Sequence, residues 1–181
     1  MEHKIIKRKI CLLGSPSVGK TSLIRKFVFD SFSDKYISTV GTKVTKKDIE
    51  LVIAKSNLKI TLSLMIWDVL GQTGYKSLHA MFYRGASAAM IVCDLTKKPT
   101  FDGLDEWVES LFKVTKPIPV IFLANKADLT DNYAFQPEDI NELSQKINTI
   151  YYPTSAKTGL NVQTAFNRLS KILIRDFLKK A

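Results

Sequence analysis

The chain has 181 residues, of which 45% are hydrophobic and 24% are charged, with only 8 Gly and 6 Pro. This length and composition favour one globular domain spanning residues 1–181 and exclude a low-complexity or disordered chain. The formal net charge of +10 suggests an anionic ligand or an anionic membrane surface. The lysines are dispersed and are not interleaved with aromatic residues, so we expect no nucleic-acid partner.

The first half of the chain predicts a strand, a helix, a long loop and a hairpin. Ile5–Leu13 is the apolar, β-rich kind of segment that is buried in a parallel sheet. A helical pattern follows and ends near Asp30, and the polar run Phe32–Val44 indicates a long loop. Asp48–Lys55 and Leu58–Trp67 alternate apolar and polar residues, which predicts a β-hairpin.

The second half alternates strands with helices. A short irregular helix runs to Tyr83, and the apolar segments Ala86–Cys93, Pro119–Leu123 and Thr149–Tyr152 predict further strands. Helical spacing recurs over residues 101–112, 137–147 and 162–177. We therefore expect an α/β fold with a doubly wound, six-stranded, mostly parallel sheet. It would carry one antiparallel edge hairpin, helices on both faces, and ligands at the carboxyl ends of its strands.

A phosphate-binding pattern lies between the first strand and the first helix. Residues 14–21 match G-x-x-x-x-G-K-[ST]. In this pattern, backbone N–H groups and the positive end of the helix hold a polyphosphate. We expect Lys20 to reach the β- and γ-phosphates and Thr21 to bind Mg²⁺. Asp68, at the end of a predicted strand, would hold the same ion through a water molecule.

Two more polar motifs follow predicted strands. In Asn125-Lys126-Ala127-Asp128, the Asp128 carboxylate can accept hydrogen bonds from the N1–H and N2–H₂ groups of guanine. Adenine lacks both donors, so this residue would select guanine. Thr154–Lys157 could present a backbone N–H to the guanine O6 atom. Each motif is weak alone and gains weight from its order and place.

Together these motifs resemble those of a small GTPase of the Ras superfamily, over essentially the whole chain. The segments 30–33, 36–41, 67–68 and 82–86 are most similar to the Rab branch. The resemblance implies a P-loop GTPase G domain that binds GTP or GDP with Mg²⁺ and hydrolyses GTP to GDP and phosphate. Such a protein is a monomeric molecular switch that signals through two switch loops.

The resemblance also implies roles for individual residues. Gln72 would orient the attacking water and Lys20 would act on the phosphates, so both are the expected catalytic residues. Thr39 would bind Mg²⁺ together with Thr21 and Asp68. The expected nucleotide-binding residues are Gly14, Ser15, Ser17, Val18, Gly19, Lys20, Thr21, Ser22, Phe32, Thr39, Gly71, Asn125, Lys126, Asp128, Ser155, Ala156 and Lys157.

Effectors, exchange factors and activating proteins would contact the switch loops. The patch analogous to a Rab effector surface consists of Val44, Trp67 and Phe82. Val44 departs from the family pattern because it replaces an aromatic residue.

Three further departures lie near the expected site of hydrolysis. Pro16 removes one backbone N–H from the phosphate loop and adds a ring close to the γ-phosphate. Leu70 replaces a small residue, and Thr73 replaces the usual Glu after Gln72. These changes leave open an alternative function, a guanine-nucleotide-binding interaction module with very slow or no hydrolysis. An ATP-using P-loop kinase is disfavoured, because it would leave Asn125–Asp128 unexplained.

Cys11 and Cys93 both lie in apolar runs, which indicates buried free thiols in a reducing cytosol. No apolar run is long enough for a secretory signal or a transmembrane helix. No Cys follows Cys93, so no prenylation motif is visible. We expect a cytoplasmic protein, and peripheral association with the cytoplasmic face of a membrane stays open.

Overall fold

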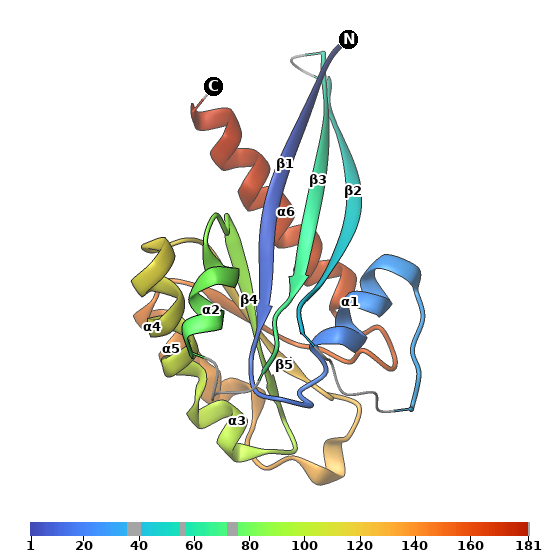
Figure 1. Cartoon of the computed structure of the whole chain (residues 1–181). Helices are drawn as coiled ribbons and strands as arrows, with labels where there is room; N and C mark the ends of the chain where they lie inside the picture. Colours follow the sequence, from blue (N-terminus) through green and yellow to red (C-terminus); the bar gives the residue numbers. More distant parts are fainter. Residues whose placement is uncertain (36–40, 55–56, 72–75, 181) are drawn as a thin grey trace.

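The structure, a computed structural model, describes residues 1–35, 41–54, 57–71 and 76–180 (Figure 1). Within these residues, six strands form one sheet in the order β2-β3-β1-β4-β5-β6. The β2–β3 pair at one edge is antiparallel, and every other neighbouring pair is parallel. The strands are β1 (Glu2–Leu13), β2 (Lys43–Ile53), β3 (Leu58–Asp68), β4 (Ala88–Asp94), β5 (Val120–Asn125) and β6 (Ile150–Pro153).

Helices cover both faces of the sheet. They are α1 (Lys20–Phe29), α2 (Lys76–Tyr83), α3 (Lys98–Asp102), α4 (Leu104–Thr115), α5 (Asn141–Lys146) and α6 (Val162–Lys180), with two 3₁₀ helices, η3 (Thr130–Asn132) and η4 (Pro137–Ile140). Figure 1 shows α6 crossing behind β1 and β3 and α1 at the right, whereas α2, α3, α4 and α5 lie at the left. The helices α1 and α6 pack on one face of the sheet, and α2 and α4 pack on the other. The predicted doubly wound α/β fold is therefore confirmed.

Two hydrophobic clusters lie on the two faces of this one sheet. Along β1 the side chains alternate, so that Ile10 and Leu12 pack with α1 and α6, whereas Cys11 and Leu13 pack with α2 and α4. All seven residues of β4 are buried, as expected for a central strand with helices on both faces. This double burial explains why the central strands have nearly continuous apolar sequences.

Strand β2 begins earlier than the sequence predicts. The segment Phe32–Val44 was expected to be a loop, but β2 starts at Lys43, which pairs with Asp68 of β3. The β2–β3 ladder continues without interruption from that pair to Ile53 opposite Leu58. Backbone pairing with β3 therefore overrides the polar sequence, because strand ladders require backbone groups and not apolar side chains.

Two predicted helices are interrupted. Gly103 caps the C-terminus of α3 and the N-terminus of α4, so the helical pattern of residues 101–112 belongs to two helices. The segment predicted to be one helix from Pro137 begins as the 3₁₀ helix η4 and continues as α5. In both places the apolar spacing correctly predicted helical structure. It could not reveal the interruption of the helix, because the same face stays buried on both sides of the interruption.

Both cysteines are buried free thiols, as predicted. Burial raises the pKa of Cys11 and the pKa of Cys93 to about 12 each, so neither thiol is a reactive thiolate at neutral pH. Among the helices that the structure describes, none combines the length and apolarity needed to cross a bilayer.

Candidate functional site

A cavity of about 530 Å³ opens at the carboxyl ends of the parallel strands. The strands β3, β1, β4 and β5 are neighbours and run in the same direction, so their final residues lie along one edge of the sheet. The chain passes to one side of β1 to form β2 and β3 and to the other side to form β4, β5 and β6. The cavity therefore lies at the topological switch point, where doubly wound folds bind their ligands.

Most of the predicted nucleotide-binding and metal-binding residues line this cavity. Those that do are Ser17, Gly19, Lys20, Thr21, Ser22, Phe32, Asp68, Gly71, Asn125, Lys126, Asp128, Ala156 and Lys157. Gly14, Ser15, Val18 and Ser155 lie behind this lining and bond to residues within it. Thr39 and Gln72 lie outside the described residues, and so does Thr73. The structure thus brings together five separate parts of the sequence, namely residues 17–22, 32, 68–71, 125–128 and 156–157.

The phosphate loop connects β1 to α1 in a conformation that requires glycine. Gly19 has φ +102°, and a Cβ atom there would lie 2.3 Å from the Asn125 side-chain nitrogen. Asn125 also donates from that nitrogen to the Val18 carbonyl at 2.9 Å. The loop is therefore packed directly against the end of β5.

Lys20 is buried at the base of the loop, with 7% of its surface exposed. Its Nζ donates to the carbonyl oxygens of Gly14 at 2.7 Å and Ser15 at 2.8 Å. Burial lowers the pKa of Lys20 to about 8, and the charge of Asp68 partly opposes this shift. An anion in the cavity would favour the charged ammonium form, because it would replace the hydration that burial removes.

Asp68 ends β3 and is 2% exposed. Its Oδ2 accepts a hydrogen bond from the Thr21 hydroxyl, and its Oδ1 is buried with no hydrogen-bond partner within the described ranges. Burial raises the pKa of Asp68, and the Thr21 hydrogen bond and the charges of Lys20 and Lys43 oppose that rise. A buried, unpartnered carboxylate oxygen beside a hydroxyl fits a hard divalent cation such as Mg²⁺ or its bound water.

Another part of the cavity is lined by Asn125, Lys126 and Asp128 at the end of β5 and by Ala156 and Lys157 after β6. The Asn125 Oδ1 accepts hydrogen bonds from the Ala156 N–H and the Thr154 hydroxyl, both at 3.3 Å. The Ser155 hydroxyl donates to the Asp128 carboxylate at 2.6 Å. Asn125 thus joins the phosphate loop to the loop after β6, and Ser155 holds the orientation of Asp128.

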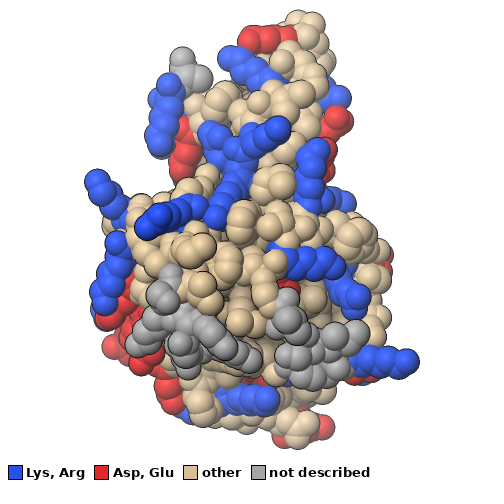
Figure 2. All heavy atoms as spheres, in the orientation of Figure 1, with Lys and Arg blue, Asp and Glu red and all other residues tan. Residues whose placement is uncertain are grey.

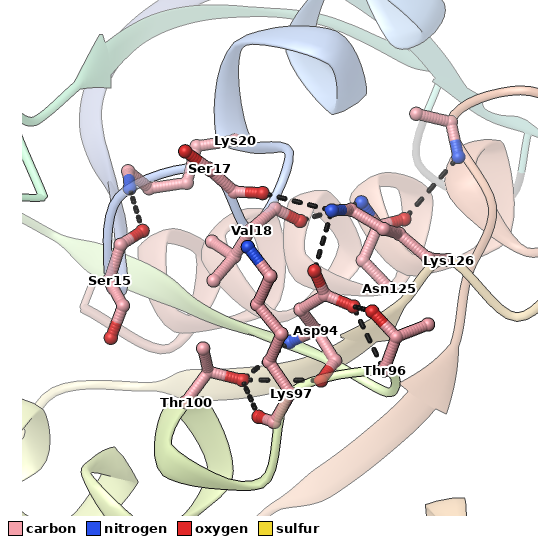
Figure 3. Close-up of polar contacts among 11 residues, drawn as sticks. Ser15, Ser17, Val18, Lys20, Asp94, Thr96, Lys97, Thr100, Asn125 and Lys126 are labelled. Carbon is pink, nitrogen blue, oxygen red and sulfur yellow. Dashed lines mark hydrogen bonds and ion pairs between the residues drawn. The ribbon is translucent and has the colours of Figure 1, made fainter. Parts of the chain in front are cut away.

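Sequence reasoning missed Asp94, which lies under this site. Asp94 ends β4, is fully buried, and forms an ion pair with Lys126 at 2.5 Å (Figure 3). Its Oδ1 also accepts hydrogen bonds from the backbone N–H and the hydroxyl of Thr96. Lys126 in turn donates to the Ser17 carbonyl at 3.0 Å. Asp94 could have been identified from the sequence, because it follows a buried strand as Asp68 does.

Three cations that the motifs did not indicate also line the cavity, namely Arg25, Lys35 and Lys43. Lys43 lies directly opposite Asp68 in the β2–β3 register. Only the register of the hairpin reveals this neighbour, because the sequence shows Lys43 simply as part of a basic run.

The proposed partner patch forms a contiguous group. Val44 lies opposite Trp67 in the β2–β3 ladder, and the ring centroids of Trp67 and Phe82 are 6.4 Å apart. Val44 is 40% exposed, and the Lys9 Nζ lies 3.8 Å from the centroid of the Trp67 ring. The patch is thus an apolar surface with a basic side chain over its largest ring.

His79 of α2 is a buried titratable residue next to this site, and sequence reasoning missed it. It is 4% exposed and contacts the Leu70 carbonyl with its Nε2 at 3.0 Å. Desolvation lowers the pKa of His79 from its usual value of 6.5, the hydrogen bond to Leu70 opposes this shift, and the charge of Lys20 adds to it. The neutral form of this ring therefore predominates in the folded protein at neutral pH.

Stability should accordingly fall on acidification. Because the pKa of His79 is lower in the folded state, the unfolded chain binds a proton more readily as the pH drops through about 6.5. We expect the free energy of unfolding, measured by urea titration, to decrease between pH 7.5 and pH 5.5, and to decrease less in His79→Gln. Equal pH slopes for the two proteins would contradict this prediction.

A phosphate loop between β1 and α1, together with polar motifs after β3, β5 and β6, defines a P-loop nucleotide-binding protein. Comparison of the sequence with known proteins shows which family of P-loop proteins this chain belongs to. The model of the Ras family matches residues 9–175, which is most of the chain. The chain belongs to the Ras family.

Curated relatives agree with this assignment. The chain is 37% identical over 164 residues to the Ras-related protein Rab-22A of Mus musculus, covering 90% of this chain and 81% of that protein. It is 37% identical over 174 residues to the Ras-related protein RABF2a of Arabidopsis thaliana, covering 96% and 84%. It is 34% identical over 173 residues to the Ras-related protein RABA4b of Arabidopsis thaliana, covering 95% and 75%.

The chain is therefore a Rab-like small GTPase, a molecular switch that binds GTP and GDP and hydrolyses GTP. The predicted family, function and enzyme class are confirmed. Interaction with effectors, exchange factors and activating proteins follows in general from this membership.

Proposed function

We propose that the cavity binds the guanine nucleotide, with its phosphates over residues 14–21 and its base beside residues 125–128 and 155–157. The observation that carries this proposal is the convergence of Lys20, Asp68 and Asp128 on one cavity at the switch point of the sheet. Lys20 and the N-terminal end of α1 supply positive charge for the phosphates. Asp128, oriented by Ser155, accepts hydrogen bonds from the base.

We further propose that Mg²⁺ accompanies the nucleotide. Thr21 and Asp68 would hold the ion together with Thr39. When bound, the ion neutralises charge on the β- and γ-phosphate oxygens. Support comes from the buried, unpartnered Oδ1 of Asp68 beside the Thr21 hydroxyl.

The two switch loops would report the γ-phosphate. Thr39 and Gly71 contact this phosphate, and Gln72 orients the water that attacks it. Lys20 binds the transferred group in both the ground state and the transition state. After hydrolysis, the contacts of Thr39 and Gly71 are lost and both loops relax, which is the change that partners read.

Partners are proposed to bind the patch of Val44, Trp67 and Phe82. We also propose one domain, a monomer, and a cytoplasmic location with peripheral membrane association. Figure 2 shows Lys and Arg atoms spread over β1, β2 and β3, on the side of the sheet that α1 and α6 do not cover. A basic surface of this kind favours an anionic membrane, although Asp and Glu atoms lie among the cations.

Replacing Gln72 tests the catalytic part of the proposal. Gln72→Leu removes the group that orients water, so the rate of single-turnover GTP hydrolysis should fall by about 10-fold or more while GDP affinity stays the same. Phosphate release from GTP-loaded protein measures this rate. Gln145→Leu, the same change at an exposed position of α5, is the matched control.

An unchanged rate in Gln72→Leu would remove the role assigned to this residue. No phosphate release from the parent protein over hours would instead favour the interaction module with very slow or no hydrolysis.

A further inference from the structure

The His79 ring packs near two aromatic side chains in the interior. Its centroid lies 6.0 Å from that of Tyr83 in the same helix and 5.4 Å from that of Trp107 in α4. Packing alone would be satisfied by an apolar ring, because burying an imidazole costs free energy unless its polar atoms are bonded. The hydrogen bond to Leu70 is therefore the feature that distinguishes His79 from a core phenylalanine.

The geometry of this bond fixes the position of a proton. A carbonyl oxygen can only accept a hydrogen bond, so the Nε2 atom of His79 must carry the hydrogen. The neutral ring then exists as the Nε2–H tautomer, with its Nδ1 atom unprotonated. This assignment can be checked without any substitution.

The hydrogen bond restrains the peptide group that joins Leu70 to Gly71, because its acceptor is the carbonyl oxygen of that group. This group is planar, and in the trans form its C=O and N–H point in opposite directions. The structure contains no cis peptide bond in its described part. A Leu70 carbonyl held toward His79 therefore leaves the Gly71 N–H directed away from α2, and Leu70 and Gly71 both line the cavity.

Gly71 itself is packed against the phosphate loop. A Cβ atom at Gly71 would lie 2.6 Å from the Pro16 nitrogen and 2.7 Å from the Gly14 carbonyl oxygen. This close approach leaves the Gly71 backbone little freedom on that side. Rotation of the peptide group about its flanking bonds is then restrained on one side by the loop and on the other by His79.

We propose that His79 is a positioning residue for GTP hydrolysis, which orients the Leu70–Gly71 peptide so that the Gly71 N–H faces the terminal phosphate. This inference rests on the proposed function, because it takes the γ-phosphate contact of Gly71 from there. A donor that is already oriented stabilises developing charge without the cost of reorganisation. GDP has no γ-phosphate, so its binding does not depend on this donor.

Two substitutions separate the hydrogen bond from the packing. His79→Phe keeps a ring between Tyr83 and Trp107 but removes the donor, whereas His79→Gln keeps a side-chain N–H at a similar reach. We expect His79→Phe to slow single-turnover GTP hydrolysis by about 10-fold with GDP affinity within about 2-fold of the parent, and His79→Gln to recover most of the rate.

The outcomes are distinct. Parent protein that neither binds nor hydrolyses GTP defeats the proposed function itself. Parent hydrolysis together with an unchanged rate in His79→Phe overturns this inference alone, as does equal loss of GDP affinity and hydrolysis rate in His79→Phe and His79→Gln.

A measurement on the parent protein covers the case in which the variants fail to fold. Nitrogen-15 NMR of the imidazole distinguishes the two neutral tautomers and the protonated ring. We expect the Nε2–H tautomer for His79 at pH 7.5. The Nδ1–H tautomer or a protonated ring would overturn the inference.

Discussion

Replacing Lys20 by alanine is expected to abolish tight binding of both GTP and GDP. The ammonium group is buried at the base of the phosphate loop, and burial lowers its pKa to about 8. A phosphate anion beside this group would stabilise its charged form. Its removal leaves phosphate oxygens without a charged donor. The loss should be about 3 kcal/mol or more, which corresponds to about 100-fold in Kd, measured by titration with a fluorescent GDP analogue.

Lys171→Ala is the matched control, because Lys171 is an exposed lysine on α6. Its affinity should equal that of the parent. Circular dichroism must show that Lys20→Ala is folded, since the Lys20 Nζ also bonds the carbonyls of Gly14 and Ser15. A folded Lys20→Ala that binds GDP as tightly as the parent would show that the phosphates do not lie over this loop.

Replacing Asp128 by asparagine is expected to remove most of the preference for guanine. The carboxylate accepts two hydrogen bonds from guanine, whereas an asparagine amide places one N–H donor against a donor of the base. The affinity for GTP should fall by about 100-fold, the scale of unpaired buried polar groups. Xanthosine triphosphate carries a carbonyl at C2 in place of the amino group, so it should bind the variant better than GTP does.

Competition among GTP, ATP and xanthosine triphosphate for a fluorescent nucleotide measures this change. Asp131→Asn is the control, because Asp131 is exposed in η3 and does not line the cavity. If Asp128→Asn keeps the parent's ratio of GTP to ATP affinity, the assignment of the base site to Asp128 is wrong.

The sequence alone predicted that the candidate motifs share one edge of the sheet, because each of them follows a strand. The glycines and Lys20 lie between a strand and a helix, and Asp68 and Asn125 end strands, so the α/β pattern alone predicted one shared edge. Parallel strands necessarily bring their carboxyl ends together. Apolar periodicity therefore predicted both the sheet and the side of it that carries the site.

Contacts that depend on register or on tertiary packing could not be predicted. The ladder between β2 and β3 sets Lys43 opposite Asp68, although the polar sequence Phe32–Val44 indicated a loop. His79 was part of a short helical pattern, and only the fold brings it to Leu70 and Trp107. These features arise from pairs of residues far apart in the chain, and periodicity reports only local repetition.

The contacts of Asn125 also could not be predicted from its motif. The sequence assigned it to nucleotide binding, yet its amide bonds Val18 on one side and Ala156 on the other. In this arrangement it joins two loops of the site. A motif thus indicates that a residue belongs to a site, whereas the division between ligand contact and loop support depends on the three-dimensional arrangement.

The identity of the nucleotide that the purified protein carries tests guanine-nucleotide binding without any substitution. The purified protein should be denatured and the released nucleotide identified by ion-exchange chromatography and mass spectrometry. We expect a guanine nucleotide, with GDP the main species because GTP is hydrolysed on the protein. An adenine nucleotide, or no nucleotide together with no measurable affinity for GDP, would contradict this expectation.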